Sequence, residues 1–385
     1  MTDKMRGKLQ PYNYVIVKGK KLYFGYTTGA SAAAAAKGAA LMLKKQVKIT
    51  EVSMKLYSGH KLTVPLDDIV LEKDRVSCAV VKDGGDDPDI TTGLKIYAVV
   101  SFKDKPGISL RGGKGVGIVL EPGLQLKIGE PAINPVPRKM IREAVKGIFP
   151  EDIGLTVEIS VPGGKEVAKR TLNPRLGIKD GISILGTTGV VVPMSEAAFK
   201  DSIVLELKKL KNENKEEVVL VPGNYGKEMA MSKFAIPHND IIEMSNYVGY
   251  VLEHAVDLGF RDILIVGHLG KLIKVAGGIF NTHSRVADGR NEIMAGIAAY
   301  HGVSQSVILD IFKAKTTEKM VDDLYKIVRK DIFPWIAERV VQRIKEYLRK
   351  EENEVNIEVL LYTFHQGVIG TSKGFDNLLS YFISS

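Results

Sequence analysis

The sequence predicts two parts: an α+β domain with mostly antiparallel strands over residues 1–200, and a smaller α/β domain with a parallel, doubly wound sheet over residues 201–385. In the first part, short segments with period-2 alternation lie between Gly, Pro and Asp turns, which is typical of antiparallel strands. In the second part, short apolar runs alternate with helical segments, which is typical of parallel βαβ units. Between the two, residues 195–217 predict a helix that ends in a charged linker.

The first part opens with a helix of very small side chains. Residues 30–36 are six alanines and one serine, and Thr27 or Thr28 before them is a residue type that caps helix N-termini. Strands are expected at 52–59, 60–66, 75–83, 94–102 and 154–164, and a helix at 134–149 with Pro137 in its first turn. Because alanine is small, a sheet or a ligand can approach the backbone of the first helix closely.

In the second part, apolar runs within 216–226, 239–245 and 261–278 each lead into a helical segment. We expect a fourth strand at 305–312 and a late strand at 355–364. A long helix over 321–353 should be interrupted at Pro334, because proline lacks the backbone N–H that a helix interior requires.

Composition narrows the class of protein. The single cysteine, Cys78, excludes an intramolecular disulfide framework and a Cys-based zinc site. There is no apolar run of membrane-spanning length, and residues 1–14 lack the apolar core of a signal peptide, so we expect a cytoplasmic protein without a membrane span. Residues 1–200 hold 31 Lys and Arg against 20 Asp and Glu, whereas the remainder holds 23 against 25. This excess in the first part favours an anionic partner, either nucleic acid or a polycarboxylate or phosphate ligand, although a solvated lysine-rich surface would look the same.

Small and polar residues follow the first three strands of the α/β part. In such sheets, ligands bind beyond the carboxyl ends of the strands at the topological switch point. The first strand leads into Gly223, Asn224 and Gly226 at the start of a helix, whose N–H groups suit an anion. Glu243 ends the second strand at an offset typical of acids that hold ribose hydroxyls. The third strand ends in the residues 267–271, Gly-His-Leu-Gly-Lys.

Together these residues predict a pocket for a ligand with a ribose and an anionic end. Neither a G-x-G-x-x-G nor a P-loop pattern is present, so classical NAD binding and a P-loop are unsupported. The alternative is that these segments are simply short turns.

Two loops are dense in polar residues. The loop 277–292 includes His283, which could act as a general base because the ordinary pKa of histidine lies near neutral pH. Structural hydrogen bonding within the loop is the alternative for each of its residues. The loop 82–93 holds four aspartates, yet Asp, Gly and Pro are also what tight turns use, and we expect no metal site. In the helix 134–149, the residues Arg138, Lys139 and Arg142 are well placed for carboxylates.

Several segments, in this order, resemble the CbiD family of cobalamin biosynthesis. They include FGYTTGASAAAAAKGAA, DGGDDPDITTG, GEPAINPVPRKMI, VPGNYG and GHLGKLIKVAGGIFNTHSRVADGR, and the resemblance extends from about residue 22 to beyond residue 300. It implies S-adenosylmethionine-dependent methylation at C-1 of cobalt-precorrin-5B, which gives cobalt-precorrin-6A in the anaerobic route. The family often has cysteine where this chain has Ser31, so a nucleophilic thiol is not available at that position.

The resemblance assigns a role to each candidate residue. The substrate's carboxylates would account for the basic first part, and the ribose and carboxylate of S-adenosylmethionine suit the α/β pocket. A corrinoid carbon would attack the sulfonium methyl in line, while the protein positions both partners and excludes water. The expected catalytic residues are His283, His268 and Asp288, the last orienting a histidine. The expected cofactor-binding residues are Gly223, Asn224, Gly226, Glu243, Gly267 and Gly270. The expected substrate-binding residues are Thr28, Gly29, Ser31, Arg111, Arg138, Lys139, Arg142, Arg175 and Arg285.

Three other functions compete with this reading. A nucleic-acid-binding protein is suggested by the basic first part, but aromatic residues do not interleave with its basic runs. A nucleotide-dependent kinase would require Mg²⁺, with Asp86 or Asp87 as a ligand. A non-catalytic corrinoid carrier would bind the macrocycle without the methyl donor. Binding of S-adenosylmethionine separates the methyltransferase from all three, and the sequence leaves open whether the chain forms a homo-oligomer.

Overall fold

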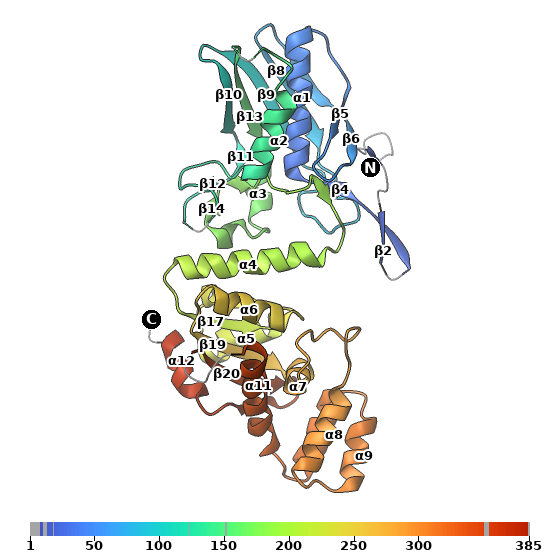
Figure 1. Cartoon of the computed structure of the whole chain (residues 1–385), viewed down its shortest axis with the longest axis vertical. Coiled ribbons are helices and arrows are strands. Elements are labelled where there is room, and N and C mark those ends of the chain that lie inside the picture. The colour runs from blue at the N-terminus through green and yellow to red at the C-terminus, as the bar shows by residue number, and fades with distance from the viewer. Residues whose placement is uncertain are drawn as a thin grey trace. The chain divides into compact units, whose positions relative to one another are not determined.

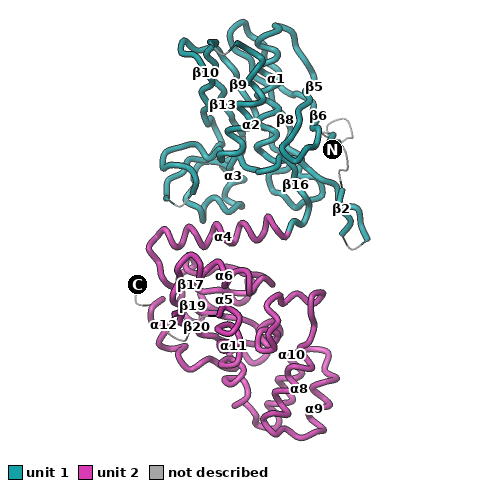
Figure 2. Tube along the Cα trace, viewed as in Figure 1, with its two compact units in different colours: residues 1–195 teal, residues 196–385 magenta. Residues whose placement is uncertain are grey.

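The computed structural model of the chain describes residues 8–10, 14–17, 19–122, 124–150, 152–349 and 354–383. The chain divides into two compact units, residues 1–195 and 196–385, which are coloured separately in Figure 2. The second unit begins with helix α4 (Glu196–Asn212), at the place where the sequence predicts a helix. Figure 1 shows the elements of each unit.

A five-stranded sheet and two helices form the core of the first unit. The strand order is β10-β13-β9-β8-β7; β10 and β13 are parallel and the other neighbours are antiparallel. Alternate residues of β8 and β9, among them Cys78 and Val100, are buried, as the period-2 pattern predicts. Helix α1 (Thr28–Lys45) packs on β8 and β9, and α2 (Pro135–Val145) packs beside α1 (Figure 1). The strands are β7 Asp67–Leu71, β8 Arg75–Val81, β9 Lys95–Lys103, β10 Gly107–Gly112 and β13 Gly154–Ser160.

Shorter elements complete the described part of the first unit. An antiparallel sheet of order β1-β6-β5 also contacts α1 through β5, and short pairs join β2 to β3, β4 to β16, β11 to β15 and β12 to β14. The strands predicted in this unit are confirmed, whereas β7 and β10 were missed because exposed and intermediate residues dominate both. The bounds are β1 Lys8–Gln10, β2 Tyr14–Val17, β3 Lys20–Tyr23, β4 Gly25–Tyr26, β5 Glu51–Lys55, β6 Lys61–Pro65, β11 Gly115–Val116, β12 Ile118–Val119, β14 Ile178–Lys179, β15 Gly181–Ile182, β16 Val190–Val191, α3 Gly164–Ala168 and η2 Asn173–Leu176.

The second unit is built on a sheet of order β18-β17-β19-β20-β21. The first four strands are parallel to their neighbours, and β21 pairs antiparallel with β20. Both faces are buried: Val218 and Leu220 of β17 join one hydrophobic cluster, and Val219 and Val221 join another. Burial on both faces explains why these strands read as continuous apolar runs. The bounds are β17 Glu217–Val221, β18 Ile241–Glu243, β19 Asp262–His268, β20 Asn356–Thr363 and β21 Gly367–Thr371.

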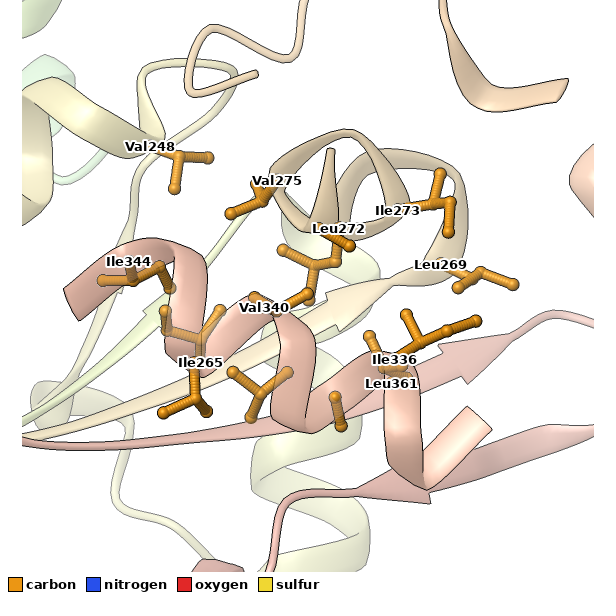
Figure 3. Packing of buried hydrophobic residues seen from close by; sticks show 14 of the residues in the cluster. Val248, Ile265, Leu269, Leu272, Ile273, Val275, Ile336, Val340, Ile344 and Leu361 are labelled. Carbon is orange, nitrogen blue, oxygen red and sulfur yellow. The ribbon is translucent and has the colours of Figure 1, made fainter. Parts of the chain in front are cut away.

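Helices cover the two faces of this sheet. The larger cluster joins the sheet to α4, α6, α7 and α11, and Figure 3 shows side chains of α7 and α11, such as Leu272 and Val340, over Ile265 of β19. The smaller cluster joins the other face to α5 and α12. The helices are α5 Asn224–Phe234, η3 His238–Asp240, α6 Val248–Asp257, α7 Leu269–Ala276, α8 Arg290–Tyr300, α9 Gln305–Lys313, α10 Thr317–Lys326, α11 Ile332–Leu348 and α12 Phe375–Ile383.

Two expectations for the second unit are wrong in position or type. Residues 305–312 form helix α9 and not a strand, since Val307, Ile308 and Ile311 fit a helical period; the fourth parallel strand is β20, which the sequence predicts as the late strand. The long helix is interrupted at 327–331, where Val328 has a φ of 60°, and not at Pro334. Pro334 lies in the first turn of α11, where its missing N–H has no partner to lose. The last predicted residues of that helix, 350–353, lie outside the described residues.

Candidate functional site

The carboxyl ends of the parallel strands bring several predicted residues to one edge of the second unit's sheet. Strand β17 has β18 on one side and β19 on the other, so the connections diverge beside it, as at a topological switch point. Gly223 follows β17, Glu243 ends β18 and His268 ends β19. Because these strands are parallel, the segments that follow them leave the sheet at this same edge.

The carboxylate of Glu243 lies beside an open turn. The side chain is half-buried, and among the described residues no hydrogen bond or ion pair to it is found. A Cβ built on Gly223 would lie 3.9 Å from Oε1 of Glu243 and would meet no closer atom. Helix α5 begins next, at the exposed Asn224, without a side-chain cap on its N–H groups. The turn therefore offers acceptor oxygens and helix N–H groups next to free space.

The other predicted glycines have structural reasons. A Cβ on Gly226 would lie 2.9 Å from the carbonyl oxygen of Val266, and one on Gly267 would lie 2.5 Å from Cδ1 of Leu272. On Gly270 the added atom would lie 3.0 Å from Nδ1 of His268. These three positions allow helices α5 and α7 to approach the sheet, so the requirement for glycine there follows from packing and does not itself indicate a ligand.

Lys271 belongs to the segment 267–271 that the sequence places at the predicted pocket, but the sequence did not predict its contacts. Its Nζ donates hydrogen bonds to the carbonyl oxygens of Pro222, at 2.7 Å, and Ser245, at 3.3 Å. Burial lowers the pKa of Lys271, while the nearby charge of Glu243 opposes that shift. Lys271 thus links the turns after β17 and β18 at the switch point, and it brings a positive charge close to Glu243.

A second lysine of α7, also missed, holds the loop 277–289. Lys274 is 3% exposed, and its Nζ donates to the carbonyl oxygens of Thr282 at 3.1 Å and Ala287 at 2.8 Å. The main-chain N–H of Thr282 donates to the carbonyl oxygen of Asn246 at 3.0 Å. The polar loop therefore packs beside the segment that follows Glu243, so the predicted catalytic loop and the predicted cofactor turn occupy the same region of this unit.

The polar side chains at the tip of this loop point to solvent. His283 is exposed, and its Nδ1 accepts a hydrogen bond from the N–H of Arg285, whose side chain is exposed as well. In the neutral ring the proton is then on Nε2, so His283 takes up a proton only by losing this hydrogen bond. Asp288 accepts two hydrogen bonds from Arg290, and these lower the pKa of Asp288. Its Oδ1 lies 3.7 Å from Nζ of Lys274. The structure pairs Asp288 with these cations and not with either predicted catalytic histidine.

Both ring nitrogens of His268 have partners. Nδ1 accepts from the N–H of Gly270 and caps α7, and Nε2 lies 2.9 Å from Oε1 of Glu318. The ring also stacks on Phe364, with centroids 4.6 Å apart. Burial raises the pKa of Glu318, but hydrogen bonds from His268 and from the N–H groups of Phe364 and His365 lower it, and the net shift is downward. His268 is thus held in one tautomer as a cap, and a proton-transfer role stays a prediction.

In the first unit, the predicted substrate residues of α1 are buried. Thr28 Oγ1 accepts from the N–H of Leu185 at 2.9 Å, and the N–H of Gly29 donates to the carbonyl oxygen of Leu185. Ser31 is fully buried and donates to the carbonyl oxygen of Thr27, the residue that caps the helix. The backbone of the alanine helix is therefore approached closely by the protein's own β8, β9 and α2, and a substrate contact by these residues stays untested.

The predicted basic residues of the first unit fall in several places. Arg138, Lys139 and Arg142 of α2 line a cavity of about 720 Å³, which also involves Lys146 and Glu143. Its apolar wall is formed by Ile108, Val145, Phe149, Ile153 and Leu155. Arg111 is exposed on β10, and Arg175 is partly exposed in η2; neither lines this cavity.

The aspartates of the loop 82–93 accept hydrogen bonds from main-chain N–H groups inside and outside the loop. Asp86 accepts from the N–H of Tyr23, Asp87 from that of Met194, and Asp89 from that of Thr91. Asp89 also pairs with Lys82, whose side chain is fully buried. Within the described ranges, no group of three or more His, Cys, Asp or Glu residues is arranged to hold a metal ion.

Comparison with known proteins identifies the relatives of this chain. The family model described as CbiD matches residues 15–193, and the model described as CbiD, C-terminal domain, matches residues 281–373. A protein of Alkaliphilus metalliredigens named cobalt-precorrin-5B C(1)-methyltransferase is 44% identical over 92% of this chain and 94% of its own length. The chain belongs to the CbiD family.

Two further proteins are similar to this chain. A protein of the same name from Thermoanaerobacter sp. is 48% identical over 92% of this chain and 97% of its own length. The crystal structure of a cobalamin biosynthesis protein (CbiD) from Archaeoglobus fulgidus is 28% identical, with a TM-score of 0.39, over 76% of this chain and 88% of that one. Residues 194–280, which include Gly223 and Glu243, lie between the two CbiD family models, whereas His283 lies inside the second. In the part of the chain that the structure describes, no helix is long and apolar enough to cross a membrane.

Proposed function

We propose that this chain methylates C-1 of cobalt-precorrin-5B, giving cobalt-precorrin-6A in cobalamin biosynthesis, with S-adenosylmethionine as the methyl donor. The names of its relatives support the reaction and its corrinoid substrate. The observation that supports a donor site is the carboxylate of Glu243, which has no hydrogen bond or ion pair among the described residues and lies beside the open turn at Gly223, at the switch point of the sheet.

The residues at this turn fit the chemistry of the donor. S-adenosylmethionine has a ribose, whose hydroxyl groups can donate hydrogen bonds to Glu243. It also has a carboxylate, which suits the uncapped N-terminus of α5. The absence of a side chain at Gly223 leaves space beside Oε1 of Glu243. Lys271 adds a positive charge close to the same turn. Ribose and carboxylate therefore have complementary partners at and just after the ends of neighbouring strands.

The chain's contribution to the reaction is positioning and exclusion of water. When bound, S-adenosylmethionine supplies a methyl group already activated on a sulfonium. Orientation of two bound reactants can lower a barrier by roughly 7–11 kcal/mol without a strong acid or base. His283 is our candidate for the base that accepts the proton lost by the substrate. Its Nδ1 would first have to give up the hydrogen bond from the N–H of Arg285. Arg285, exposed beside it, is a candidate contact for a substrate carboxylate.

We further propose that the two parts predicted from the sequence have different roles. Residues 1–200, in which Lys and Arg outnumber Asp and Glu by 31 to 20, would bind the corrinoid carboxylates through Arg111, Arg138, Lys139, Arg142 and Arg175. Residues 201–385, whose sheet we interpret as doubly wound, would bind the methyl donor.

Calorimetric titration with S-adenosylhomocysteine, the demethylated donor, tests the donor site. Wild type should bind it, and Glu243→Gln should bind at least tenfold more weakly, because a charged acceptor contributes about 1.5–3 kcal/mol per hydrogen bond. The matched control is Glu228→Gln, which removes an exposed carboxylate from α5 and should leave binding unchanged. Equal affinities of wild type and Glu243→Gln would refute the assignment. Anaerobic transfer of labelled methyl to cobalt-precorrin-5B then tests the reaction itself.

A further inference from the structure

The cavity on α2 combines an apolar wall with a cationic rim. The wall residues Ile108, Phe149 and Ile153 are partly exposed around a space of about 720 Å³, within the usual range of small-molecule sites. The side of α2 that faces the core carries the buried Met140 and Ile141, which do not line the cavity.

The cations of the rim form a row along the helix. Arg138, Arg142 and Lys146 are spaced four residues apart, so they lie on one side of the helix over about 12 Å. Like charges at this spacing disfavour a helix. Glu143 offsets part of this charge, but its carboxylate is held by the hydroxyl of Tyr57 at 2.5 Å and lies 3.8 Å from Nζ of Lys139.

Arg138 and Arg142 differ in their partners. The guanidinium of Arg138 donates to the carbonyl oxygens of Ile133 and Pro131 and to Glu130 at 3.1 Å, so it fixes the segment before α2. The exposed side chain of Arg142 has no hydrogen bond or ion pair within the described ranges. Arg142 is thus a planar, bidentate donor with free capacity at the edge of an apolar cavity.

We propose that this cavity binds the carboxylate-bearing periphery of the corrinoid, with Arg142 as the carboxylate ligand and the apolar wall against the ring carbons. This inference rests on the proposed function, since it takes the substrate from there. It assigns Arg138 to positioning and Arg142 to ligand contact, although both belong to the same predicted set. A flat apolar body with carboxylates at its edge matches the wall and the rim together.

Two corrins that differ in charge test the proposal by calorimetry. Cobyrinic acid has free peripheral carboxylates, whereas nearly all of these are amides in cobyric acid. Arg142→Gln should bind cobyrinic acid about tenfold more weakly than wild type does, with little change for cobyric acid. Ile108→Trp, which fills the cavity from β10, should weaken binding of both corrins. Arg75→Gln, which removes an exposed arginine from β8, is the matched control and should change neither.

Several results would overturn the proposal. One is equal binding of cobyrinic acid by Arg142→Gln and Arg75→Gln; another is unchanged binding of both corrins by Ile108→Trp. A third is equal loss of both corrins in Arg142→Gln, which would indicate a structural role. Binding of S-adenosylhomocysteine is measured on the same samples. Its absence in wild type would count against the donor site while the corrin comparison still decides on the cavity.

Discussion

The ammonium group of Lys271 donates a hydrogen bond of 2.7 Å to the carbonyl oxygen of Pro222, so a helix after the third strand holds the turn after the first. The same group donates to Ser245 after the second strand, at 3.3 Å. An ammonium has three N–H donors, and among the described residues Lys271 has these two acceptors, so one donor is left for a ligand. The remaining donor lies close to the open turn at Gly223, where we place the carboxylate of the methyl donor.

The first prediction concerns this remaining donor. Lys271→Met should weaken binding of S-adenosylhomocysteine about tenfold more than binding of 5′-methylthioadenosine, which lacks the amino acid end. Glu243→Gln should weaken both ligands alike, because both contain the ribose. Calorimetry on the two variants measures the difference. Equal loss of both ligands in Lys271→Met would show that this lysine only holds the turns together.

The second prediction separates capping from catalysis at His268. His268→Ala removes the acceptor for the N–H of Gly270 and should cost about 1 kcal/mol of unfolding free energy, the usual value of an N-cap. His268→Asn keeps an acceptor and should restore most of that stability. Urea unfolding gives the stabilities and a methyl-transfer assay gives the rates. If the asparagine variant is as stable as wild type but inactive, His268 does more than cap the helix.

The third prediction concerns the pair formed by the fully buried Lys82 and the partly buried Asp89. Burial alone would raise the pKa of Asp89, but the charge and hydrogen bond of Lys82 outweigh it and the pKa is lowered. The resulting stability is therefore present above the ordinary aspartate pKa of about 3.9 and is lost as the pH falls through the lowered value. Asp89→Asn should cost roughly 3–5 kcal/mol at neutral pH, because it leaves Lys82 charged and unpaired in the interior.

Urea unfolding between pH 3 and 7 (about the range in which aspartates titrate) measures this effect. The loss of stability on acidification should be smaller in Asp89→Asn than in wild type. The double variant Lys82→Met/Asp89→Leu should recover much of the lost stability, since no unpaired charge remains. A single variant as stable as wild type would show that Lys82 reaches solvent or another partner.

The fourth prediction concerns the space around α1. Ala34 is fully buried, so Ala34→Leu should destabilise the first unit by roughly 1–3 kcal/mol through overpacking. Lys45→Leu introduces leucine at an exposed position of the same helix and should change the free energy of unfolding little. Urea unfolding compares the two. If Ala34→Leu is tolerated like the control, the small side chains are not needed for the approach of sheet and helix.

Much of the fold follows from local patterns. Alternation at Val76, Cys78 and Val80 predicts a strand with one buried face, and the structure has it in β8. The apolar run 305–312 was wrongly predicted as a strand, because a short apolar run fits either a strand or a helix. Its packing against α8 and α10 selects the helix. The parallel pairing of β10 with β13 joins segments separated by α2, so no local pattern predicts it.

The candidate site was predictable to a lesser degree. The spacing from Gly223 to Glu243 places both at one sheet edge, since strand ends are local features. The contact of Thr28 with Leu185 spans 157 residues, so the sequence could not show that the start of α1 is covered by protein. The contacts of Lys271 and Lys274 could not be predicted, because their amines bind carbonyl groups that other loops contribute.

The buried amine of Lys274 also determines where the polar loop can change in length. It donates to the carbonyl oxygens of Thr282 and Ala287, so the chain between these two residues is a loop that is fixed at both ends. Residues 283–286, between these two carbonyls, are all exposed. Insertions or deletions within residues 283–286 would therefore leave the contacts of Thr282 and Ala287 in place. A change in length between residues 275 and 281 would instead move Thr282 away from Asn246. The tip that carries His283 can thus be lengthened or shortened independently of the strands below it.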